Sequence, residues 1–350
     1  MSDQKQHVGA GSLAIQTGGN TTINQGLSPE NMRQILEILA SQRSTFAAIA
    51  REIVDARLAD FDNRLVARFY QSGAGNPEAL KDPDFQYILT RAQYAYARSG
   101  DQGIRDMLVD LIASRSKQTT RSRLSLTLNT AIETAAVLTQ NEFAELTLCY
   151  LIRYSLFSFP ALSNFGAQFS HFISPLLPDI SRSEASYQYI EAQSCGAIGL
   201  GELSLIQILR TNYSNIFSGG FDRAYLVGFF AEERVKQMEA NQLIIPCLND
   251  STKVQLDVPN RQRFNALEEV LKLSKHEQDT LWNVFDSSVW NGAAFLQNVE
   301  KAYPEIRLLN SLWDDTQLKN LTLTTIGIAI GHANSRRIAG FGADLGIWIK

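Results

Sequence analysis

Cysteine and histidine, on which many metal and redox centres depend, are scarce in this sequence. Its 350 residues include three cysteines and four histidines. Cys149, Cys195 and Cys247 are far apart, and none has a neighbour at the spacing of a metal or redox site. An odd number of separated thiols is typical of reduced residues in a protein core. We therefore expect no metal site and a cytoplasmic protein.

The chain also lacks the linear motifs that mark common catalytic sites. It has no Gly-x-Ser-x-Gly turn, no His-Glu-x-x-His helix, no Cys-x-x-Cys pair and no phosphate-binding loop with Gly-Lys-Ser or Gly-Lys-Thr. The glycine cluster at 196–201 lacks the glycine order of a dinucleotide-binding loop, so we expect a loop between two helices without a ligand. We predict no cofactor, and the balance favours a protein that is not an enzyme.

Neither sign of charge dominates. The sequence has 32 basic and 36 acidic residues, spread evenly, and a formal net charge of −4, which makes nucleic-acid binding unlikely. The densest basic stretch lies between the end of one predicted helix and the start of the next. We take this stretch as a candidate surface for a protein partner or a phosphate backbone; its residues are Arg115, Lys117, Arg121 and Arg123. The commoner alternative is a solvated junction between two helices.

Long apolar runs are missing as well. No stretch approaches the roughly 18 uncharged apolar residues of a membrane-spanning helix, and the first six residues lack the apolar region of a secretion signal. We expect a protein that is neither exported by that route nor embedded in a membrane. The segment 321–333 is apolar and rich in small residues, and Gly327 and Gly331 share one helical face. Close helix packing is the first interpretation of these two glycines.

What the sequence does contain at its start is a short polar repeat. The segment 11–16 is echoed eight residues later by 19–24, and its Gly, Asn and Thr content suits strands and turns. Two such strands are marginal alone, so we expect them to pair with copies from other chains. The predicted self-association residues are Gly11, Leu13, Ile15, Gly19, Asn20, Ile23 and Asn24, with Ile35, Leu39 and Phe46 of the following helix.

That helix is predicted from Leu27-Ser28-Pro29, which combines an apolar staple residue, an N-cap serine and a proline at the first helical position. Apolar residues then recur at spacings of three and four until Gly73. The pattern predicts one very long helix, or two nearly collinear ones, of roughly 60 Å. Helical rods of this length often mediate self-association, here as a coiled coil.

The remaining chain is predicted to be mainly helical. Capping boxes at Thr139–Glu142 and Ser274–Glu277 open two helices, and two strand-like segments within 242–258 suggest a small hairpin. We predict a mainly α fold: a multi-helical body with a long N-terminal helix, a Gly/Asn-rich β segment at the N-terminus and that hairpin. The predicted parts are a β oligomerisation tag at 1–26, an N-terminal helical domain at 27–178 and a C-terminal helical domain at 179–350.

Four parts of the sequence carry a resemblance to a known family: the opening up to Gly26-Leu27-Ser28, the segments 84–87 and 96–101, the segment 323–330 and the segment 344–349. In these parts the chain resembles an uncharacterised family of bacterial proteins. The resemblance covers nearly the whole chain and implies a bacterial, soluble, mostly helical protein, without an activity or catalytic residues to carry over. Similar Gly/Asn strand tags occur at the start of other bacterial proteins that act in conflict with phages.

Together these observations predict a non-enzymatic, homo-oligomeric scaffold or sensor protein, in phage defence or stress response, that binds itself and a protein partner. Two alternatives remain. One is an enzyme whose site is assembled without a linear motif from His171, His332, Asp314 and Arg153. The other is a membrane-perturbing effector that acts through the apolar segment 321–333.

Overall fold

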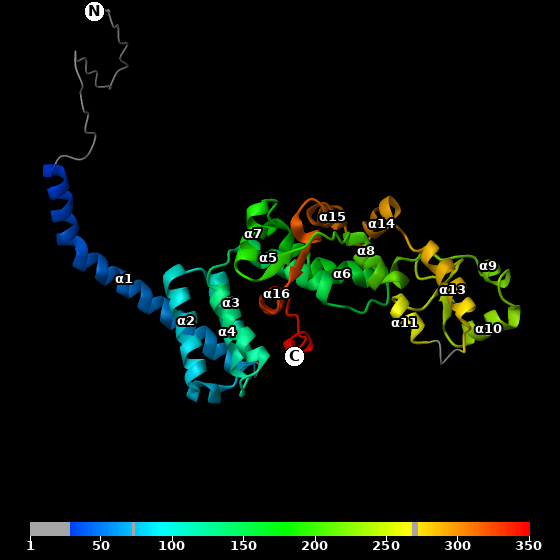
Figure 1. Ribbon diagram of the computed structural model, residues 1–350, viewed down its shortest axis with the longest axis horizontal. Helices are drawn as coiled ribbons and strands as arrows, with labels where there is room; N and C mark the ends of the chain where they lie inside the picture. The colour runs from blue at the N-terminus through cyan, green and yellow to red at the C-terminus, as the bar shows by residue number, and fades with distance from the viewer. Residues whose placement is uncertain (1–28, 72–73, 268–271) are drawn as a thin grey trace, which may run out of the picture. The chain divides into compact units, whose positions relative to one another are not determined.

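The computed structural model describes residues 29–71, 74–267 and 272–350 (Figure 1). By their contacts, the residues divide into two compact units, Met1–Val54 and Asp55–Lys350, and each is described by itself. The predicted tag, with its seven self-association residues between Gly11 and Asn24, lies outside the described residues.

Helix α1, Pro29–Gln71, is the long helix predicted from the apolar spacing. It is one continuous helix of 43 residues, which at 1.5 Å a residue is about 65 Å long. In the first unit, every side chain of α1 that the structure describes is exposed except the half-buried Val54. In the second unit, Phe61, Leu65 and Phe69 of α1 are buried. Along α1, the described side chains therefore change from almost all exposed in the first unit to partly buried in the core of the second unit.

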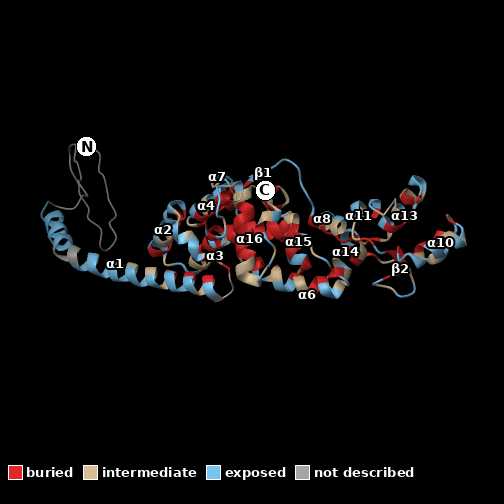
Figure 2. Cartoon of the chain, turned by 90° about the horizontal axis from the view of Figure 1, so that it is seen from below, coloured by how far each residue is buried: buried red, intermediate tan, exposed pale blue. Residues whose placement is uncertain are grey.

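The core of the second unit is a group of helices around α16, Thr325–Ala339. Helix α16 packs against four α-helices from much earlier in the chain: Gln102–Ser116, Arg123–Ala135, Gln140–Cys149 and Leu162–Phe172. All side chains from Gly327 to Ser335 are buried, and most of α16 is red in Figure 2. The helices of this group that precede it are α2 (Pro83–Ser99), α3 (Gln102–Ser116), α4 (Arg123–Ala135) and α5 (Gln140–Cys149).

Two small antiparallel sheets accompany the helices. Strand β1, Gly196–Ile198, pairs with β4, Leu321–Leu323, with Gly196 opposite Leu323. The expectation of a plain loop at 196–201 was therefore wrong, because half of that segment is paired with a distant strand. Strand β2, Ile244–Pro246, pairs with β3, Val254–Leu256, which confirms the hairpin predicted within 242–258.

The rest of the second unit consists of shorter helices. Both predicted capping boxes form: the backbone N–H groups of Thr139 and Ser274 donate to the carboxylates of Glu142 and Glu277 at 2.8 and 2.7 Å. A π-helical turn, Tyr150–Tyr154, extends α5. The other helices are α6 (Leu162–Phe172), α7 (Glu184–Ala192), α8 (Leu205–Asn212), α9 (Arg223–Val227), α10 (Glu232–Ala240), α11 (Arg261–Asn265), α13 (Lys275–Ser288), α14 (Gly292–Val299) and α15 (Ile306–Asp314). The 3₁₀ turns are Pro77–Lys81, Ser174–Asp179, Ser214–Phe217, Gln317–Lys319 and Leu345–Ile347.

The mainly α fold is confirmed. The expected boundary between 178 and 179 falls inside the second unit, where α16 packs against α5, and the division into 27–178 and 179–350 stays a prediction. Across the described ranges, none of the helices has both the length and the apolar character needed to cross a bilayer.

Candidate functional sites

The first candidate site is the exposed apolar face of α1 in the first unit. Its large apolar side chains are between 39% and 58% exposed. The exposed residues are Met32, Ile35, Leu36, Ile38, Leu39, Ile49 and Ile53. Except for Leu36 and Ile38, these exposed apolar residues fall at the a and d positions of one heptad register. Phe46 also lies at an a position of that register. We call the apolar residues at the a and d positions, Met32, Ile35, Leu39, Phe46, Ile49 and Ile53, the heptad face; Gln42 occupies the remaining d position.

The side chains of the heptad face that the structure describes are all exposed in the first unit. An isolated helix is marginal in water, and most helices in proteins are stabilised by packing an apolar stripe against a neighbour. The predicted self-association residues Ile35 and Leu39 lie on this face, 39% and 51% exposed. Phe46 lies in the same helix, and its side chain is outside the described ones.

The predicted basic stretch divides in the structure. Arg115 is buried and fully engaged: its guanidinium donates to Asp84 at 2.6 Å, to Asn129 at 2.7 Å and to the carbonyl of Gln118 at 3.0 Å. Hydrogen bonds from Asn129 and Arg115 lower the pKa of Asp84. Arg115 therefore joins α3 to its neighbours.

The other three residues of that stretch, Lys117, Arg121 and Arg123, are exposed. Lys117 lines a cavity of the second unit, whereas Arg123 lines a different, more open one with Thr127 and Ile326. The partner surface proposed for the four residues stays a prediction.

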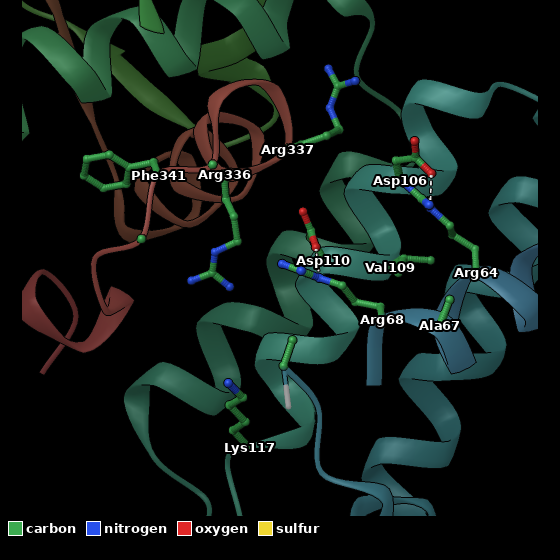
Figure 3. A pocket seen from close by; sticks show the side chains of 13 residues that line it. Arg64, Ala67, Arg68, Asp106, Val109, Asp110, Lys117, Arg336, Arg337 and Phe341 are labelled. Carbon is green, nitrogen blue, oxygen red and sulfur yellow. Dashed lines mark hydrogen bonds and ion pairs between the residues drawn. The ribbon is translucent and has the colours of Figure 1, made fainter. Parts of the chain in front are cut away.

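The second candidate site is the cavity that Lys117 lines, which has a volume of about 550 Å³ (Figure 3). It lies between α1, α3 and the end of α16, all within the second unit. The turn after α16, Gly340–Gly342, forms part of its wall. Gly340 has a φ of 70°, which favours glycine, and it ends α16 as a left-handed cap.

Two ion pairs occupy one side of this cavity, which we call the α16 cavity. The Nε atom of Arg64 lies 3.2 Å from a carboxylate oxygen of Asp106, and that of Arg68 lies 2.6 Å from Asp110. Burial raises the pKa of Asp110 although Arg68 opposes the shift. Both carboxylates of the α16 cavity are thus within ion-pair distance of an arginine of the same cavity.

The remaining cations of the cavity come from the last turn of α16 and the end of α3. Arg337 donates from Nε to the side-chain oxygen of Asn334 at 3.0 Å. Burial lowers the pKa of both Arg336 and Arg337. In Figure 3, Arg336 extends from α16 toward the Arg68–Asp110 pair. The predicted site residues did not include Arg64, Arg68, Arg336 or Arg337.

The four residues of the enzyme hypothesis each have their own partners. His171 and His332 lie 3.0 and 2.8 Å from the carbonyls of Ala339 and Ala343, Arg153 donates to the carbonyl of Leu321, and Asp314 accepts from Asn310. None of these contacts joins two of the four residues. Burial lowers the pKa of His332 to about 4, so its ring is neutral near pH 7.

The three cysteines are buried free thiols, as expected. Burial raises the pKa of Cys149 and of Cys195 to about 12, which makes both poor nucleophiles. Within the ranges that the structure describes, no group of three or more His, Cys, Asp and Glu residues is placed to hold a metal ion.

A protein-family model matches residues 26–349; its description reads only "-like" and names no activity. The match begins at the end of the predicted tag and includes both the heptad face and the α16 cavity. No curated protein and no solved structure matches the chain.

Proposed function

The chain belongs to the uncharacterised family whose model spans residues 26–349, and we propose that it is a homo-oligomeric scaffold whose copies associate through the heptad face of α1. The observation that carries this proposal is a row of apolar side chains at the a and d positions of α1, which are 39% to 51% exposed where the structure describes them. Packing that row against its counterpart on a second chain removes it from water and stabilises the helix.

A second copy of the chain is the partner that the spacing favours. Met32, Ile35 and Leu39 follow one another at intervals of three and four residues, and so do Phe46, Ile49 and Ile53. The seven residues from Leu39 to Phe46 keep both sets in one heptad register, with Gln42 at the d position between them. A strict seven-residue repeat keeps an apolar stripe facing an identical helix along a left-handed supercoil. Nearly four heptads fit between residues 29 and 54, which is the length at which such a pattern becomes informative.

The residue types around Leu39 favour more than two chains. Leucine at a with isoleucine at d shifts coiled coils toward trimers and tetramers, and Leu39 lies at a between Ile35 and Ile49 at d. Leu36 and Ile38 at the flanking e and g positions are apolar and exposed, which widens the face. We expect a mass three or four times that of the 39.0 kDa chain.

The predicted tag at 1–26 fits a parallel arrangement of these helices. The tag directly precedes α1, so a parallel bundle gathers one copy of it from each chain at the same end, where the strands can pair. In a scaffold of this kind, several copies of the helical body act together, and weak contacts with a protein partner gain avidity. A role in phage defence or stress response depends on the resemblance of the tag and stays a prediction.

Light scattering coupled to size-exclusion chromatography tests the proposal on the full chain. We expect Leu39→Asp and Ile49→Asp to reduce the oligomer, because each buried apolar side chain contributes roughly 1.5–3 kcal/mol in every chain and a buried aspartate adds a desolvation cost. Val66→Asp is the matched control, since Val66 is a 55% exposed residue of α1 outside the heptad face. A monomeric wild-type chain, or an oligomer that both face variants leave intact, contradicts the proposal.

Removal of residues 1–26 distinguishes the contribution of the tag to self-association from that of the helix. We expect the shortened chain to keep the coiled-coil oligomer with a weaker association, measured as a higher chain concentration for half dissociation. An unchanged oligomer refutes the role of the tag and leaves that of the heptad face intact. A monomer shows that the tag, and not the helix, holds the chains together.

A further inference from the structure

The α16 cavity carries more positive charge than its own carboxylates neutralise. Five cationic side chains and two carboxylates line it, in a chain whose formal net charge is −4. Asp106 and Asp110 are already within 3.2 and 2.6 Å of a cavity arginine. Among the described residues, Lys117, Arg336 and Arg337 have no carboxylate within ion-pair distance.

Arg336 is the most informative of these three cations. It is half-buried, and its guanidinium has no hydrogen bond or ion pair with any residue that the structure describes. The two carboxylates that attract Arg336 are engaged elsewhere: Asp110 lies 2.6 Å from Arg68, and Asp344 accepts from the backbone N–H of Gly346 at 2.6 Å. A guanidinium has five N–H donors, and a partly desolvated cation without a partner is costly. An anion that accepts from these donors offsets that cost.

From this arrangement we propose that the α16 cavity binds a small molecule that carries at least two phosphate groups, through Arg336, Arg337 and Lys117. A guanidinium binds two phosphate oxygens through parallel N–H bonds, and a lysine adds a compact charge. A terminal phosphate carries a charge of about −1.5 to −2 at pH 7, so two phosphates match three unpaired cations better than one does.

The size and the walls of the cavity favour a small molecule. About 550 Å³ lies inside the range of roughly 300–1,000 Å³ that is typical of small-molecule sites. Ala67, Ala74 and Val109 supply apolar wall beside the charged residues, which gives the rest of a phosphate ester a surface to contact. A nucleic acid needs an extended basic surface instead, and the even spread of charge in this chain does not supply one.

Isothermal titration of the full chain with inorganic pyrophosphate, and in parallel with inorganic phosphate, tests the proposal. We expect one pyrophosphate per chain, bound more tightly than phosphate. We expect Arg336→Gln to weaken the binding by about 10–100-fold, the usual effect of losing hydrogen bonds to a charged group. Arg98→Gln is the matched control, because it removes the same charge from an exposed position on α2 outside the cavity.

The outcomes distinguish specific binding in the α16 cavity from non-specific electrostatic attraction. Loss of binding in Arg336→Gln with retention in Arg98→Gln supports the site. If Arg336→Gln does not fold, as judged by circular dichroism, Lys117→Gln replaces it, since Lys117 is exposed, and a severalfold loss is expected. No binding of pyrophosphate to the wild-type chain, an equal loss in both arginine variants, or binding of a single-stranded oligonucleotide that pyrophosphate cannot displace overturns the proposal.

Discussion

Gly331 of α16 packs directly against the main-chain carbonyl of Leu146 in α5: a Cβ atom on residue 331 would lie 2.8 Å from that oxygen. Gly327, one turn earlier, faces the carbonyl of Cys195 in the same manner. The close packing predicted from the four-residue spacing of these two glycines is therefore what the fold uses. The segment that contains them is buried inside the second unit, so α16 is a core helix.

We expect Gly331→Ala to destabilise the protein by about 1–3 kcal/mol, the usual cost of overpacking. Within a helix, alanine is more favourable than glycine by about 1 kcal/mol. The variant is therefore destabilised only if the cost of the steric clash exceeds this gain. Urea unfolding at a fixed chain concentration measures the difference as a shift in midpoint at constant slope. Gly201→Ala is the control, because nothing lies within 4 Å of a Cβ atom there. Equal or higher stability of Gly331→Ala contradicts the packing argument.

Local signals in the sequence predicted the local structure. The staple and proline before α1, the regular apolar spacing and the two capping boxes each act within one or two helical turns, and all gave the correct elements. The pairing of β1 with β4 was missed because each strand has three residues and its partner lies far away in the chain. A strand so short has no periodic pattern of its own, and tertiary packing alone selects it.

The same distinction between local and long-range signals applies to the candidate sites. Ile35 and Leu39 were predicted because the heptad face is a repeat within one helix. The α16 cavity was missed because α1, α3 and α16 each contribute one or two cations, and no single segment shows the excess charge. Lys117 was singled out only because Arg115, Arg121 and Arg123 lie close to it in the sequence, yet in the structure Lys117 lines the cavity and Arg115 is buried in a different network.

That difference within the basic stretch is testable. We expect Arg115→Gln to destabilise the protein by about 1.5–3 kcal/mol, because it breaks the charged hydrogen bond to Asp84 and leaves the carbonyl of Gln118 with one donor fewer. Arg121→Gln removes the same charge from an exposed position, and we expect a change within about 0.5 kcal/mol. Urea unfolding of both variants checks this. Equal effects would mean that Arg115 is no more structural than Arg121.

Two glutamates of α5 share one buried serine. The hydroxyl of Ser186 lies 3.0 Å from Glu142 and 2.8 Å from Glu145, and all three residues are buried. Burial raises the pKa of Glu145 to about 8, and the neighbouring Glu142 adds to the shift. Near pH 7, Glu145 is therefore mainly protonated, and its proton allows it to donate to Ser186 while Ser186 donates to Glu142.

This arrangement predicts a stability that falls as the pH rises. The pKa of Glu145 is higher in the folded chain, about 8, than the value of roughly 4.3 expected in the unfolded chain. The folded state therefore binds the proton more tightly. The resulting stabilisation is fully present below the unfolded pKa, declines above it and is lost as the pH passes through about 8.

The substitution Glu145→Gln tests this dependence, because a glutamine amide resembles the protonated carboxyl group. We expect the melting temperature of the variant to match that of the wild type near pH 5 and to exceed it at pH 9, by about 2–4 °C for each kcal/mol. Glu184→Gln is the control, an exposed glutamate at the start of α7, and its difference from the wild type is expected to change little with pH. Calorimetry at several pH values measures both. A Glu145→Gln difference that stays constant from pH 5 to pH 9 would show that Glu145 does not carry this proton in the folded chain.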